Sequence, residues 1–111
     1  MDNVTVVDRP ESSRFEALGA DGEVVGFIDY RPAQHTGEDS SAADLELVHT
    51  EVDPGEEGHG VGTQLVREAL DQLRASGRGV MPLCAFVSAF ISDHPEYQDL
   101  VRTEAGRGQG G

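Results

Sequence analysis

The stretch that decides the fold is residues 45–73, LELVHTEVDPGEEGHGVGTQLVREALDQL. Its first eight residues mix apolar and β-branched side chains, which predicts a strand over residues 45–52. A turn follows at Asp53-Pro54-Gly55, and a glycine-spaced loop, GHGVG at residues 58–62, then leads directly into an amphipathic helix. Small residues let backbone N–H groups approach an anion closely, and a helix N-terminus adds about half a positive charge. The stretch therefore predicts a site for a ligand that carries a pyrophosphate.

The helix is expected over residues 60–76, because apolar side chains recur at three- and four-residue spacing. They are Val61, Leu65, Val66, Ala69, Leu70 and Leu73. Residues 79–84 then predict a buried strand, which should lie parallel to the first because a helix connects the two. Pro82 cannot donate a ladder hydrogen bond, so one side of that strand should be open. A short apolar helix over residues 85–92 should end at a turn formed by HPEY, residues 94–97.

The residues before this stretch predict an antiparallel β-meander. Short runs near residues 4–8, 14–18 and 23–30 are separated by Arg9-Pro10 and by a hairpin turn over residues 19–22. Residues 31–43 are polar and indicate an exposed loop, which is either a substrate-side loop or plain surface. The glycine-rich residues 104–111 predict a disordered tail, so a single domain is expected over residues 1–103.

Composition narrows the classes of function. The chain has 111 residues, a formal charge of −13 and one cysteine, Cys84. The acidity argues against binding to nucleic acid or to an anionic membrane, and no apolar run approaches the ~20 residues that span a bilayer. A single cysteine precludes an intramolecular disulfide, which favours a cytoplasmic location. The four histidines and Cys84 share no metal-ligand spacing, so no metal is predicted.

In this order the features resemble the GNAT superfamily of N-acetyltransferases, whose phosphate motif is Gln/Arg-x-x-Gly-x-Gly/Ala. The frame falls on EGHGVG, residues 57–62. Together with HTEV at 49–52, the run from PLC at 82–84 to HPEY at 94–97 is similar to a minimal, single-domain GNAT-like group. The resemblance covers about residues 14–101. It implies an α/β (α+β) fold in which an antiparallel β-meander precedes a strand, glycine loop, helix and strand, with the two parallel strands splayed apart.

The resemblance also implies that acetyl-CoA lies between these two parallel strands. Its pantetheine would pair with the backbone at Glu51 and Val52. Its pyrophosphate would bind the amides of the glycine loop, namely Glu57, Gly58, His59, Gly60, Val61, Gly62 and Thr63. Glu57 stands where the family has Arg or Gln, and a solvated carboxylate ~4 Å from a phosphate opposes binding by roughly 1 kcal/mol. A Rossmann or Walker nucleotide site fits less well, because a meander precedes the loop and the Lys-Ser/Thr pair is missing from it.

The same resemblance makes His49 and Cys84 the expected catalytic pair. The residues alone leave two alternatives, since a cysteine at the end of an apolar strand is by default a small buried hydrophobe. In one mechanism Cys84 takes the acetyl group with His49 as base. In the other the amine attacks acetyl-CoA directly, and His49, Glu51 or Glu46 takes its proton. Many GNAT enzymes carry a Tyr acid on the helix after the fifth strand, and here Phe90 stands at the aromatic position.

The expected function is therefore acetyl-CoA-dependent N-acetyl transfer to an unidentified amine, which is a small molecule, a peptide N-terminus or a lysine side chain. The acidic composition favours a cationic acceptor. The alternative from another class is a non-catalytic module that binds acyl-CoA. A third reading is a domain that kept the fold and lost the ligand, for which Glu56 and Glu57 are the evidence.

Overall fold

A single mixed sheet organises the molecule. The computed structural model describes residues 4–33, 44–56 and 60–102, and within them the sheet has the strand order β1-β2-β3-β4-β5. The strands are β1 (Thr5–Arg9), β2 (Arg14–Leu18), β3 (Val24–Pro32), β4 (Leu45–Val52) and β5 (Val80–Pro82). The helices are α1 (Val61–Ala75) and α2 (Ala85–Asp93), with 3-10 turns η1 (Pro10–Ser12), η3 (Pro54–Glu56) and η4 (Pro95–Leu100). The first four strands are antiparallel, and β5 runs parallel to β4. The predicted meander and parallel pair are both confirmed.

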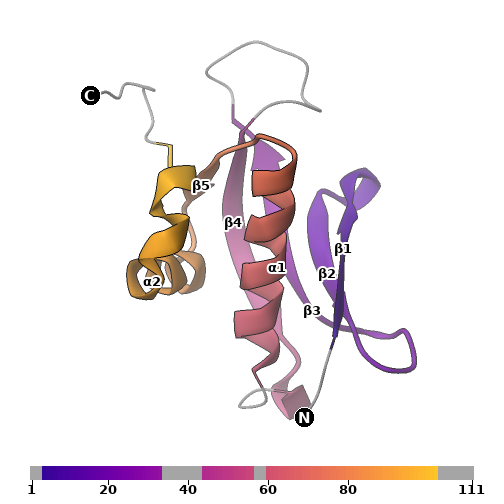
Figure 1. Ribbon diagram of the computed structural model, residues 1–111. Coiled ribbons are helices and arrows are strands. Elements are labelled where there is room, and N and C mark those ends of the chain that lie inside the picture. The colour runs from indigo at the N-terminus through magenta and orange to yellow at the C-terminus, as the bar shows by residue number, and fades with distance from the viewer. Residues whose placement is uncertain (1–3, 34–43, 57–59, 103–111) are drawn as a thin grey trace.

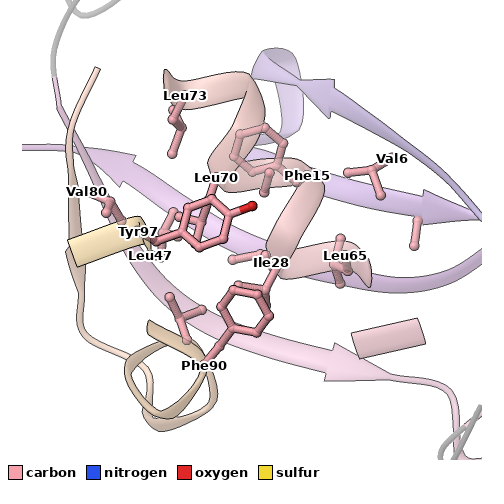
Figure 2. Close-up of a cluster of buried hydrophobic side chains, with 14 of the residues drawn as sticks. Val6, Phe15, Ile28, Leu47, Leu65, Leu70, Leu73, Val80, Phe90 and Tyr97 are labelled. Carbon is pink, nitrogen blue, oxygen red and sulfur yellow. The ribbon is translucent and has the colours of Figure 1, made fainter. Parts of the chain in front are cut away.

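Helix α1 lies across one face of the sheet, and α2 lies beside β5 at one edge (Figure 1). The apolar stripe predicted from the sequence is the buried side of α1. It packs on apolar side chains of the strands, among them Phe15, Ile28 and Leu47 (Figure 2). Gly77 ends the helix in the left-handed conformation, with φ of 76°, a backbone shape that glycine adopts without a steric penalty.

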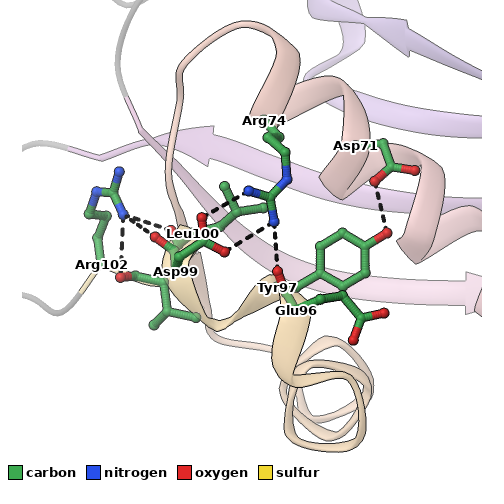
Figure 3. Close-up of polar contacts among 8 residues, drawn as sticks. Asp71, Arg74, Glu96, Tyr97, Asp99, Leu100 and Arg102 are labelled. Carbon is green, nitrogen blue, oxygen red and sulfur yellow. Dashed lines mark hydrogen bonds and ion pairs between the residues drawn. The ribbon is translucent and has the colours of Figure 1, made fainter.

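The C-terminal turn η4 is held on α1 by side-chain hydrogen bonds (Figure 3). The Tyr97 hydroxyl donates to Asp71 at 2.8 Å, and Arg74 donates to both Asp99 oxygens at 2.8 and 3.0 Å. The chain then runs along the outer edge of β5, where Arg102 N donates to Val80 O at 2.8 Å. The C-terminal segment thus fixes the position of β5 from the side away from β4.

The structure corrects two predicted boundaries. The strand expected over residues 79–84 extends only over Val80–Pro82, because the amides of Leu83 and Cys84 both turn to the carbonyl of Leu47 and α2 begins at Ala85. Strand β3 continues past the predicted end at Tyr30 to Pro32. The predicted tail at 104–111 and most of the predicted loop at 31–43 lie outside the described residues.

A β-bulge in β4 decides which side chains face the helices. Asp29 pairs with His49 and Tyr30 pairs with Leu47, so Val48 is an additional residue opposite β3. Such a bulge shifts the alternation of the strand by one residue. Leu45 and Leu47 face the helices before it, whereas Thr50 and Val52 do so after it. His49 and Glu51 therefore point to the opposite face of the sheet.

Candidate functional site

The parallel strands β4 and β5 separate after three residue pairs, which end at Leu47 and Pro82. Past that point, successive residues of β4 direct their backbone N–H and C=O groups alternately toward β3 and toward the side where β5 has ended. Asp53 N donates to Val25 O of the β3 chain, so the backbone groups of Glu51 also face β3. Those of Thr50 and Val52 face the opening where β5 has ended. Of the two residues predicted to pair with a pantetheine, Val52 has its backbone groups on this side and Glu51 does not.

The N-terminus of α1 borders the same opening. Gly60 is its N-cap with φ of 81°, and the first intrahelical bond runs from Gln64 N to Gly60 O. The amides of Val61, Gly62 and Thr63 precede that bond, so they have no acceptor within the helix. No acidic residue lies in the first turn. These amides are therefore suited to an anion, whereas Glu57, Gly58 and His59 lie outside the described residues.

Gly62 is the point where α1, α2 and β4 come together. A Cβ at this position would lie 2.8 Å from the ring of Phe86 and 3.4 Å from Val52. Phe86 and Leu83 are large apolar side chains that nevertheless remain 43% and 55% exposed. The ring of Phe86, which lies against Gly62, gives the opening an apolar surface on the α2 side, and this suits a ligand with a long aliphatic segment. This position of Phe86 was not predicted from the sequence, although an aromatic residue near the start of a helix is a visible signal.

The two predicted catalytic residues lie on different faces of β4. The Sγ atom of Cys84 lies 3.1 Å from Oγ1 of Thr50, and Cys84 is partly buried with a free thiol. His49 is exposed; its Nε2 lies 3.6 Å from a Glu51 oxygen, and its ring centroid is 6.2 Å from that of Phe27. The structure thus brings Cys84 to Thr50 and His49 to Glu51. The sequence could not show this division, because it depends on the bulge at Val48.

Other polar residues have structural partners. Burial and the hydrogen bond to Asp71 raise the pKa of Tyr97, and burial and a bond to Asp8 raise the pKa of Tyr30. His94 caps the end of α2, with Nδ1 2.8 Å from the Phe90 carbonyl, as expected for a turn or cap residue. Among the described residues, no group of three or more His, Cys, Asp or Glu side chains is placed to hold a metal. The helices in the described ranges are too short or too polar to cross a membrane.

Comparison with known proteins gives the family. A model described as GCN5-related N-acetyl-transferase matches residues 14–100, which is most of the chain. The chain belongs to this family. The predicted GNAT resemblance is confirmed, and membership supports acyl transfer as the class of chemistry. A search of curated proteins finds no match.

One of the similar solved structures supports the fold. A GCN5-like protein from Staphylococcus aureus, determined by NMR in solution, is 18% identical, covers 91% of this chain and 90% of its own, and has a TM-score of 0.59. Nourseothricin acetyltransferase, known from a crystal structure, is 20% identical in sequence. The match covers 86% of this chain and 67% of that protein, with a TM-score of 0.45. An acetyltransferase from Trypanosoma brucei is 20% identical, and the match covers 92% of this chain and 70% of that protein, with a TM-score of 0.48. The fold assignment rests on the first of these.

Proposed function

We propose that this GNAT protein is an N-acetyltransferase that uses acetyl-CoA and acetylates an amine. The observation that carries the proposal is the opening between β4 and β5, which is bordered by the glycine-rich N-terminus of α1. An extended backbone edge at Thr50 and Val52, free helix amides and the exposed ring of Phe86 occur there together. Acetyl-CoA has matching parts, namely a pantetheine with amides, a pyrophosphate and an aliphatic segment. The residues present therefore fit this cosubstrate.

In this proposal each wall of the opening binds one part of acetyl-CoA. The amides of Val61, Gly62 and Thr63, with the preceding loop of Glu57, Gly58, His59 and Gly60, hold the pyrophosphate. The backbone of Val52 pairs with the pantetheine in the manner of an added strand, and Glu51 lies beside it on the other face. Bound acetyl-CoA supplies an acetyl thioester. No metal is required in this scheme.

His49 is the proposed general base for the acceptor amine. Its imidazole is exposed, and the Glu51 carboxylate 3.6 Å away stabilises the imidazolium that forms when a proton arrives. As the amine nitrogen bonds to the acetyl carbon, one amine proton would pass to His49. The C–S bond would then break, and CoA would leave as the thiolate, which takes that proton back from the imidazolium. Cys84 lies on the helix side of β4, and two versions of the mechanism use it differently. If it is a nucleophile, incubation with acetyl-CoA alone gives an acetyl adduct visible by intact mass. If the amine attacks directly, no adduct forms.

Binding is tested first, by calorimetry with CoA and acetyl-CoA. Gly60→Leu should abolish binding, because a side chain at this φ of 81° strains the N-cap that positions the first amides of α1. Gly22→Leu is the matched control, since Gly22 has a φ of 86°, also has open space around it, and lies in the β2–β3 turn. Because both substitutions place a side chain at a similar positive φ, their costs in folding stability should be similar, and only a site at α1 predicts a difference in CoA binding between them. Equal CoA affinity of the two variants would exclude this site.

The alternative is a module that binds acyl-CoA without catalysis. The observation that favours it is the separation of His49 from Cys84, which leaves the two chemical groups on opposite faces. Turnover distinguishes the two functions. Release of CoA thiol with a library of amines, above the rate of acetyl-CoA hydrolysis, supports the transferase. Tight CoA binding without such release supports the module.

A further inference from the structure

Strand β1 is the edge of the sheet on the side away from β5 (Figure 1). Within the described residues β1 pairs with one strand only, which is β2. In an antiparallel pair, the backbone N–H and C=O groups of successive residues point alternately toward the partner strand and away from it. The groups of an edge strand that point away from its partner form a template on which another chain can pair.

The sheet register identifies which residues of β1 direct their backbone groups to this free edge. Phe27 of β3 pairs through hydrogen bonds with β4, so the next residue, Ile28, directs its groups toward β2. Phe15, which lies opposite Ile28, therefore faces β3 rather than β1. Phe15 also lies opposite Asp8, so the backbone groups of Asp8 point away from β2. Every second residue before Asp8, beginning with Val6, does the same.

Two glutamine side chains of α1 bind carbonyls on the free edge of β1. Gln64 Nε2 donates to Val4 O and Gln72 Nε2 donates to Val6 O, each at 3.0 Å. Gln64 Nε2 also donates to a carboxylate oxygen of Glu68 at 2.7 Å, so both of its hydrogens are used. Strand β1 is thus hydrogen-bonded on both sides, to β2 along one edge and to helix side chains along the other.

We propose that Gln64 and Gln72 prevent the free edge of β1 from pairing with the same edge of a second copy of this chain. Two identical edges pair antiparallel about a two-fold axis, and the ladder between them uses outward N–H and C=O groups of both strands. The two glutamines already occupy outward carbonyls, and their amides lie beside the edge that a second strand would approach. Residues 4–7, VTVV, are β-branched and include neither a charge nor a proline, so the strand itself does little to prevent such pairing.

The formal charge of −13 also opposes association of two copies, so a test has to separate the two effects. In 1 M NaCl the Debye length is about 3 Å, and repulsion between copies is largely screened. Sedimentation velocity under this condition, over a range of protein concentrations, compares the unmodified chain with the double variant Gln64→Leu/Gln72→Leu. Gln98→Leu is the matched control, because it makes the same replacement at an exposed glutamine of η4.

The double variant should self-associate at a roughly tenfold lower protein concentration than the unmodified chain and the control, which is the effect of one or two net hydrogen bonds. Hydrogen exchange should slow on association at the amides of Val6 and Asp8, which point to the free edge. Equal self-association of the three proteins would overturn the proposal. Association of the double variant without slower exchange at these two amides would overturn it as well, because the contact would then lie elsewhere.

Far-UV circular dichroism shows whether the double variant folds. If it does not, Gln72→Leu alone gives the same comparison with the same two readings, since it frees the carbonyl of Val6 and leaves the bond from Gln64 to Val4 in place.

Discussion

The contact between the Thr50 hydroxyl and the Cys84 thiol leads to a prediction about the reactivity of that thiol. A hydroxyl 3.1 Å from Cys84 Sγ can donate a hydrogen bond that stabilises the thiolate. Thr50→Val keeps the shape of the side chain and removes the donor. Alkylation of Cys84 by iodoacetamide at pH 8 should slow about threefold, the effect of one net hydrogen bond. Cys84 is the only cysteine, so intact mass measures the rate directly.

Thr50→Ser is the control for this prediction, because it restores the hydroxyl and removes only a methyl group. Its alkylation rate should return toward that of the unmodified chain. A larger decrease in His49→Ala than in Thr50→Val would contradict the division of side chains by the Val48 bulge. It would show that His49 acts on the thiol in solution.

At the scale of elements, the hydrogen bond from Tyr97 to Asp71 joins η4 to α1 (Figure 3). Tyr97→Phe removes this bond from a buried site and should lower the free energy of unfolding at pH 7 by about 1 kcal/mol. Burial is the first cause of the raised pKa of Tyr97, and the bond to Asp71 is the second. Because the folded-state pKa lies above the unfolded value, the protonated phenol stabilises the fold below about pH 10. This stabilisation is lost as pH rises through the folded-state pKa.

Urea unfolding of the two proteins at pH 7 and above pH 10 measures this linkage. The stability difference between the unmodified chain and Tyr97→Phe should shrink at the higher pH. A difference that stays constant across this range would show that the phenol does not titrate with unfolding.

The elements also show what the sequence could predict. Strand β4 and helix α1 follow from side-chain periodicity, so their bounds agree with the prediction to within a residue at each end. The predicted length of β5 was wrong, because an apolar run such as VMPLC indicates burial but does not show where the hydrogen bonds between the strands end. The bulge at Val48 was not predicted either, because nothing in the run marks the residue at which its alternation shifts. An unbroken alternation from Leu45 and Leu47 would bury His49 and Glu51 in place of Thr50 and Val52. The family was visible in the sequence, whereas the faces toward which His49 and Thr50 point required coordinates.

For the whole molecule, the net charge should determine how the binding of the two proposed substrates, acetyl-CoA and a cationic amine, responds to salt. The formal charge is −13, and the radius of gyration is 13.8 Å. The Debye length is about 30 Å at 0.01 M ionic strength and about 8 Å at 0.15 M. At low salt, every charge of the protein therefore acts on a ligand at the site. At 0.15 M only nearby groups do.

Anionic CoA should consequently bind more tightly at 0.15 M than at 0.01 M salt, by a severalfold decrease in Kd, because screening removes long-range repulsion while the helix amides remain in contact. A cationic acceptor should show the opposite trend, with KM rising as salt screens its attraction to the same acidic chain. Calorimetry of CoA and steady-state kinetics of the amine across this range provide the two measurements. A Kd for CoA that rises with salt would show that nearby positive groups, rather than the net charge, dominate the site. Opposite trends are the distinctive expectation, because a general effect of salt on folding would change both constants in the same direction.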